Sequence, residues 1–211
     1  MHPIWIWIAA LAAYGAFSCW YWNWRGPLTK PEIDAGVAAL EHTANYDSEQ
    51  LATLRTFLEA DDGREFLMFN LLRLQPGPVT PPGGGASQTA QEVVQRYSGP
   101  FMSALFRRAG HPAFLGRAVG GYVEQWGVEK NPGWTVGAAI RYRSRRDVLA
   151  MATMKEFEAI HAYKIAGLSN TLAFPVQPVI WVVSPVLVAP LAFALLAALG
   201  HLALRTFGGG S

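Results

Sequence analysis

The hydrophobic residues of the chain concentrate in two charge-free runs near its ends, from Pro3 to Tyr21 and from Val179 to Leu204. As helices rising about 1.5 Å per residue, both are long enough to cross roughly 30 Å of hydrocarbon. Aromatic residues such as Trp22 and Trp181 lie at the ends that face the rest of the chain, as they do at membrane interfaces. The pattern predicts two membrane helices, within residues 3–24 and 179–204, around one intervening domain.

Helical signals follow the first run. Thr29-Lys-Pro-Glu32 has the spacing of a capping box with proline near the helix start. Further along, Leu51, Leu54 and Leu58 recur at helical spacing. Residues 29–62 are therefore predicted to form a connector of two helices.

The stretch from Glu65 to Leu74 is almost continuously apolar and is bounded by Gly63 and a Pro/Gly-rich segment. Such a run is typical of a central strand covered on both faces. Asn70 is the polar exception, on the same side of the strand as Phe66. Its amide either bonds to neighbouring backbone or meets a ligand, because buried polar groups need partners.

The rest of residues 64–177 alternates between strand and helix signals. Helices are expected from Thr89 to Gly110 and from Ser144 to about Gly167, and strands at Ala113–Val119, Trp134–Arg143 and Thr171–Val176. With the first strand, this gives the order βαββαβ of a ferredoxin-like α+β domain, an antiparallel four-stranded sheet with both helices on one face. The uncovered face would be buried by a second copy, a ligand, lipid or a partner protein.

One side of the Trp134–Arg143 strand carries small residues that lead to Arg141, which leaves room for an acidic ligand. We expect a pocket formed by polar and aromatic residues, with Arg141 contributing more to recognition than to folding. The candidate ligand-binding residues are Asn70, Tyr97, Arg117, Trp134, Arg141 and His161. The alternative is that the arginines lie over an apolar sheet with their heads in water.

Other chemistry finds little support. Glu158 and His161 form a Glu-x-x-His pattern, but one copy is too few ligands for a metal, and no metal or cofactor is predicted. A net charge of +2 without a basic, aromatic patch gives no sign of nucleic-acid binding. No nucleophile, base and orienting acid can be grouped by spacing, so catalytic residues are not assigned.

Charges near the apolar runs bear on topology. Arg25 and Lys30 follow the first run, which favours a cytoplasmic domain on a protein of the bacterial inner membrane with two spans. A cleaved signal peptide is the alternative for the first run, but it lacks a positively charged start and an Ala-x-Ala site. Gly208–Ser211 has the composition of an added flexible linker.

Residues 66–176 contain a series of short motifs, each present once. They are Met68-Phe-Asn-Leu-Leu-Arg73, Tyr97, Ala109-Gly110, Gly116-Arg117, Trp134, Arg141-Tyr-Arg-Ser-Arg-Arg146 and Met151. This segment resembles a bacterial family of uncharacterised dimeric α/β-barrel proteins. The resemblance implies two ferredoxin-like sheets face to face, a scaffold shared with cofactor-free monooxygenases, lactone isomerases and haem-dependent enzymes. Scaffold alone assigns no chemistry.

The chain departs from that family at the positions of interest. Thr135 stands where the family usually has an acidic residue, and Ala162 and Lys164 stand where it has a His-Arg pair, with His161 one position early. One position on a helix turns a side chain by about 100°. An acid/base role at these positions is therefore not carried over from the family.

Two functions follow as hypotheses. The first is a membrane-anchored, non-catalytic binding or accessory module of a membrane protein complex, working as a homodimer or with a membrane protein partner in the lipid bilayer. The second is a membrane-tethered enzyme that acts on a small hydrophobic or anionic molecule in a dimeric α/β-barrel pocket. The missing catalytic pattern favours the first, and the small-residue strand face favours the second.

Overall fold

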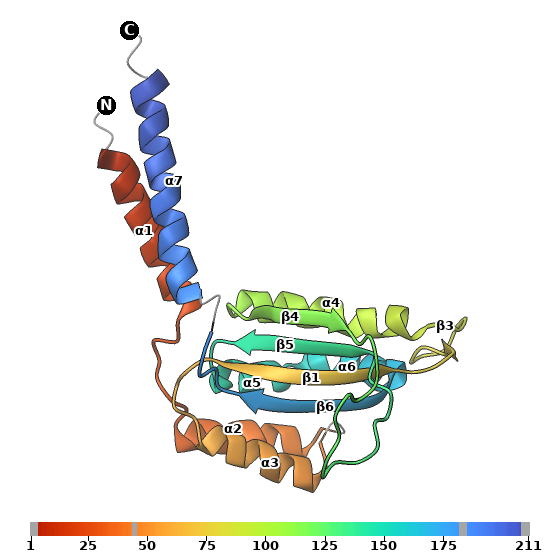
Figure 1. The fold of residues 1–211 in the computed structure, drawn as a ribbon. Coiled ribbons are helices and arrows are strands. Elements are labelled where there is room, and N and C mark those ends of the chain that lie inside the picture. Colours follow the sequence, from red (N-terminus) through yellow and green to blue (C-terminus); the bar gives the residue numbers. More distant parts are fainter. Residues whose placement is uncertain (1–3, 44–45, 182–184, 208–211) are drawn as a thin grey trace. The chain divides into compact units, whose positions relative to one another are not determined.

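The computed structural model describes residues 4–43, 46–181 and 185–207, and the linker-like residues 208–211 lie outside this part (Figure 1). The described chain divides into two compact units. One contains the terminal helices up to Trp24 and from Pro178, and the other runs from Arg25 to Gln177.

The terminal unit is a pair of antiparallel helices, α1 (Ile4–Tyr21) and α7 (Pro185–Phe207). The rings of Tyr14 and Phe193 lie 5.8 Å apart, and Trp7 Nε1 donates to Nδ1 of His201 at 3.1 Å. Both helices are long and apolar enough to cross a membrane by length and composition. The second begins at Pro185 rather than at Val179, because proline suits the first turn of a helix.

Four antiparallel strands form the sheet of the second unit in the order β4-β5-β1-β6. Their bounds are β1 Phe66–Leu74, β4 His111–Arg117, β5 Val136–Tyr142 and β6 Leu168–Val176. The central position predicted for the first strand is confirmed, since β1 pairs with β5 on one side and β6 on the other. Pro175 lies on the edge strand β6, where a missing N–H is tolerated.

Helices α4 (Ala90–Arg107), α5 (Arg145–Ala152) and α6 (Lys155–Gly167) follow the expected segments. The single helix expected from Ser144 is two helices, because Met154 adopts an extended conformation between α5 and α6. The Pro/Gly-rich segment holds a short hairpin of β2 (Pro78–Val79) and β3 (Gln88–Thr89).

The connector is a helical hairpin of α2 (Lys30–Glu41) and α3 (Ser48–Glu59). The predicted capping box is present, with Thr29 N donating to Glu32 Oε2 at 2.8 Å. A buried apolar cluster joins this hairpin to Leu149 of α5. The connector is thus part of the domain's own core.

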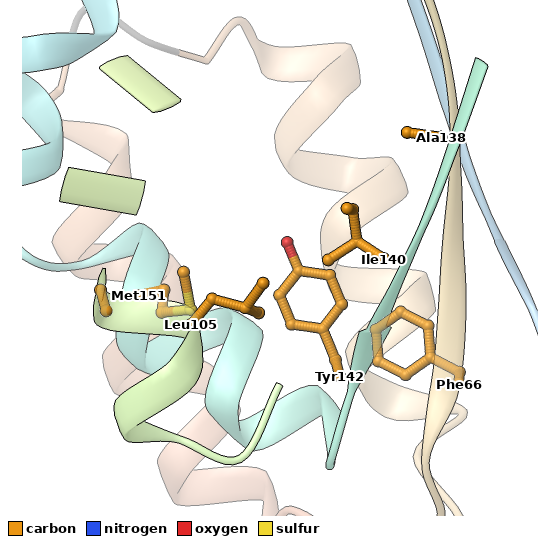
Figure 2. Packing of buried hydrophobic residues seen from close by; sticks show 7 residues of the cluster. Phe66, Leu105, Ala138, Ile140, Tyr142 and Met151 are labelled. Atoms are coloured by element: carbon orange, nitrogen blue, oxygen red, sulfur yellow. The ribbon is translucent and has the colours of Figure 1, made fainter. Parts of the chain in front are cut away.

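Alternate side chains of the strands face the helices. Phe66 and Tyr142 stack at 5.4 Å on this side, beside Ile140 and against Leu105 of α4 and Met151 of α5 (Figure 2). Figure 1 shows α4, α5 and α6 behind the sheet.

The opposite sheet face is apolar and carries no described helix (Figure 1). The register aligns Phe114, Ala139, Phe69 and Phe174 in one row across all four strands. Phe114 is 60% exposed, Phe69 38% and Phe174 45%. We call these four residues the phenylalanine row. Exposed aromatic rows on a sheet are unusual in a protein that works as an isolated monomer.

Candidate ligand site between the sheet and its helices

The apolar core between the sheet and its helices forms two separate clusters. One contains Phe66 of β1 and Leu105 of α4, with Phe157 of α6 packed against it. The other contains Val93 of α4, with Leu74 of β1 packed against it. Both β1 and α4 therefore contribute residues to one cluster near one end and to the other cluster near the other end. The residues in the middle of these elements belong to neither cluster.

Three residues singled out by the sequence lie between the cluster members along their own elements: Asn70 on β1, Tyr97 on α4 and His161 on α6. Tyr97 and His161 are in edge contact, with ring centroids 6.3 Å apart at 88°. We call this region the polar gap. Distant segments thus bring Tyr97 and His161 into contact, and strand alternation places Asn70 on the same side of β1 as Phe66, which is the side that faces the helices.

Asn70 is half-buried and lies in register between Ala138 of β5 and Ala173 of β6. Its Nδ2 donates to the carbonyl of Met68 at 2.8 Å. The predicted bond to neighbouring backbone is therefore present for the NH2 group of the amide. The Oδ1 atom accepts no hydrogen bond from any described residue. Two alanines as neighbours leave this acceptor without bulky side chains beside it on the sheet.

Lys164 joins the polar gap and was not predicted as a site residue. Its Nζ lies 5.7 Å from the centre of the Tyr97 ring, a cation–π contact. Burial lowers the pKa of Lys164, and burial followed by the charge of Lys164 lowers the pKa of His161. The i, i+3 spacing from His161 places both on one side of α6, which is the sequence signal for this residue.

Tyr142 was also not among the predicted site residues, because its position on β5 is that of an ordinary aromatic residue of the core. Burial raises its pKa, with Tyr97 and Tyr46 as smaller causes, so its hydroxyl stays protonated. The hydroxyl has no hydrogen-bond partner among the described residues.

Arg141 lies elsewhere and is built differently from the expectation. It pairs in register with Leu67, on the sheet face opposite Asn70, so the two cannot line one pocket. The residue is 0% exposed. Its Nε and Nη2 lie 2.6 and 2.5 Å from Glu65 Oε2, and Nη1 donates to the carbonyl of Ala109 at 2.5 Å. The sequence predicted a guanidinium with room for a ligand, whereas in the structure the guanidinium is buried in an ion pair with Glu65.

Arg117 and Trp134 flank the connection between β4 and β5. Arg117 is exposed at the sheet edge, opposite Val136 in register. The Trp134 Nε1 donates to the Tyr122 hydroxyl at 2.9 Å, within that connection. Neither residue makes a described contact with Asn70, and their ligand role stays a prediction.

A small pocket of about 90 Å³ lies at another place, where Phe57, Glu65, Arg145 and Gln177 meet. Arg145 Nη1 donates to the Phe57 carbonyl, and Gln177 Nε2 donates to Asp62. These polar groups already bond within the fold.

The fold defines an α+β protein with a four-stranded antiparallel sheet and helices on one face. Comparison with solved structures finds RPA0582 of Rhodopseudomonas palustris, a protein of unknown function, at TM-score 0.51 and 17% identity. The match covers 66% of this chain and 98% of that one. A structure of methylated RPA0582 matches at TM-score 0.49 and 20% identity, over 67% and 95%.

This likeness shows the fold alone, because the identity is low. No protein-family model matches the chain. No curated protein matches it either. RPA0582 is described as a protein of unknown function, which agrees with the resemblance to an uncharacterised family.

Proposed function

We propose that this protein is a membrane-anchored, non-catalytic binding module that holds a small ligand in the polar gap. The observation that carries the proposal is the interruption of the core by Asn70, Tyr97 and His161 between two apolar clusters. Each polar group there could be replaced by a hydrophobic one that packs better, since unmatched polar groups between layers cost stability. Polar groups converging in an otherwise apolar layer are typical of ligand sites.

The proposal is tested with the full-length protein in detergent and a panel of small aromatic probes: benzoate, benzamide and benzyl alcohol. We expect at least one probe to bind in ligand-observed NMR. The substitution Asn70→Leu should weaken that binding tenfold or more, because it removes an acceptor that no described residue uses. The matched control is Asn170→Leu at an exposed position of β6, which should bind like the unchanged protein.

Absence of binding by all three probes would contradict this function. So would equal binding by Asn70→Leu, because the ligand would then lie outside the polar gap.

The finer architecture is also part of the proposal. The strand order and the helices on one face support a ferredoxin-like βαββαβ domain. The exposed phenylalanine row supports a dimeric α/β barrel in which two such sheets face each other. A membrane protein partner on the same face is the alternative, with this chain as an accessory subunit.

We propose that the two terminal helices anchor the protein in a bacterial inner membrane, with the Arg25–Gln177 unit in the cytoplasm. Arg25 and Lys30, next to the first helix, support this orientation. A cysteine in place of Gly84, in the exposed Pro/Gly-rich segment, should resist an impermeant thiol reagent in intact cells. Exchanging Cys19 for Ala removes the background, and ready labelling at position 84 would reverse the orientation.

A membrane-tethered enzyme is the second candidate. The observation that favours it is the contact of Tyr97 with both His161 and Lys164, three side chains able to transfer protons. Lowered pKa values at His161 and Lys164 suit such a role. Turnover of a bound molecule, abolished by His161→Gln with binding retained, would distinguish the enzyme from the binding module.

A further inference from the structure

We propose that the pocket of about 90 Å³ beside Phe57 and Gln177 binds a zwitterionic lipid headgroup, in which a phosphate and a primary ammonium lie a few atoms apart. Phosphatidylethanolamine carries such a headgroup. We call this site the junction pocket. The inference rests on the membrane anchoring proposed above, because anchoring brings lipid to the protein, and it does not depend on the polar gap.

The junction pocket has room for a small polar group. Its volume is several times the roughly 10–15 Å³ that one water molecule needs. Phe66, Pro175 and Val176 form apolar parts of its wall. Apolar walls with a few polar groups are typical of small-molecule sites. The methylene groups of a lipid headgroup find contacts on such walls, whereas inorganic ions gain nothing from them.

Charged side chains of both signs line the junction pocket. Arg64 and Arg145 supply two positive charges, and Asp62 and Glu65 supply two negative ones. A lining in which the signs balance favours neither a simple anion nor a simple cation. It matches a ligand that carries both charges a short distance apart, since complementary charges set the specificity of an interface.

The two arginines provide the contacts for the phosphate. The guanidinium of Arg145 is held in place 4.6 Å from the centre of the Phe57 ring, and its Nη2 makes no hydrogen bond with a described residue. The side chain of Arg64 is 78% exposed, and its Nε lies 4.0 Å from Asp62, too far for a hydrogen bond. It can therefore turn toward a ligand. Guanidinium groups are well suited to phosphate oxygens.

Oxygen acceptors in the same lining provide the contacts for the ammonium. Oε2 of Glu65 is held by Arg141, but Oε1 accepts no hydrogen bond from a described residue. Gln177 donates through Nε2 to Asp62 at 2.9 Å, and its Oε1 is likewise unused by the described residues. A primary ammonium has three N–H donors for such oxygens. The trimethylammonium of choline has none.

The position of the pocket in the chain favours lipid over a free metabolite as the source of the headgroup. Gln177 is the last residue of its unit, and the chain continues from it to α7. Gly63, next to the pocket residue Arg64, packs on Gly26, which the chain reaches from α1. A β-carbon at Gly63 would lie 2.9 Å from the carbonyl carbon of Gly26. Both connections to the two apolar helices therefore start beside the junction pocket.

The test places the full-length protein in phosphatidylcholine vesicles and measures its association with spin-labelled lipids by electron paramagnetic resonance. We expect phosphatidylethanolamine to associate fivefold or more above phosphatidylcholine and phosphatidylglycerol. The choline headgroup lacks N–H donors, and the glycerol headgroup lacks the ammonium.

Two exposed residues of the lining test the location. Arg64→Gln removes a phosphate contact, and Gln177→Leu removes an ammonium acceptor. Each should reduce the preference for phosphatidylethanolamine to less than twofold. Both positions are at the surface, so folding should be preserved. The matched control is Arg107→Gln at an exposed position of α4, which should keep the full preference.

The source of the headgroup is tested with glycerophosphoethanolamine, which has the same polar groups without acyl chains. It should bind the protein in detergent at least tenfold more weakly than short-chain phosphatidylethanolamine does. Equal binding would assign the pocket to a free metabolite and overturn the lipid assignment.

Two further results would overturn the inference. One is equal association of the three spin-labelled lipids with vesicle-bound protein, which would leave the membrane anchoring standing. The other is an unchanged preference in both Arg64→Gln and Gln177→Leu, because the lipid would then bind outside the junction pocket. Protein that fails to float with the vesicles would contradict the anchoring and this inference together.

Discussion

Replacing Arg141 by Met is expected to lower the free energy of unfolding of the Arg25–Gln177 unit by about 3–5 kcal/mol. The methionine keeps much of the apolar stem but removes the charge that compensates Glu65, whose Oε2 lies 2.5 Å from Arg141 Nη2. It also leaves the buried carbonyl of Ala109 without its 2.5 Å donor. Guanidinium denaturation of the full-length protein in detergent, followed by the near-ultraviolet signal of the aromatic core, measures the change.

The matched control is Arg117→Met on the exposed end of β4. The same chemical change at a solvated position should shift the free energy of unfolding by no more than about 0.5 kcal/mol. Glu65→Gln, combined with Arg141→Met in a double-mutant cycle, measures the coupling between the partners. A loss below about 1 kcal/mol for Arg141→Met would mean that the guanidinium is solvated. That outcome would support the prediction from sequence that Arg141 contacts a ligand.

Arg141 also shows where sequence reasoning stops. Strand alternation correctly places Arg141 and Ile140 on opposite faces of the sheet. Alternation does not, however, show whether a side chain on either face is buried. Its partners come from Glu65, 76 positions away, and Ala109, 32 positions away. Such contacts depend on the tertiary fold. Local signals, by contrast, were sufficient for the capping box at Thr29 and the helix start at Thr89, where donor and acceptor are three residues apart.

The candidate site could likewise be predicted only where a residue gives a local signal in the sequence. Asn70 attracts attention because it interrupts an apolar strand, and this signal needs no knowledge of the fold. Lys164 and Tyr142 carry no such local anomaly, since one resembles a surface lysine and the other a core aromatic. Their relation to Tyr97 appears once α6 and β5 are packed beside α4. The break between α5 and α6 falls at Thr153 and Met154, where the sequence has no proline or glycine to signal it.

The prediction with the clearest consequence for architecture concerns Phe69, in the middle of the phenylalanine row. Phe69→Asp is expected to weaken self-association of the full-length protein at least a hundredfold, because each copy would bury a carboxylate without a partner. The ring of Phe69 stacks on Phe174 at 5.9 Å and is exposed in one copy, so the folded monomer should tolerate the change. Sedimentation in density-matched detergent gives the association constant.

The control is Phe106→Asp on α4, since that ring is also exposed, at 51% against 38% for Phe69, but lies on the helix side of the domain. Its self-association should match that of the unchanged protein. If the unchanged protein were strictly monomeric at high concentration, a second copy would not be what covers the phenylalanine row. If Phe106→Asp dissociated as readily as Phe69→Asp, the contact between copies would involve the helix layer instead. A loss confined to Phe69→Asp supports two sheets packed face to face, because only that surface places Phe69 at its centre.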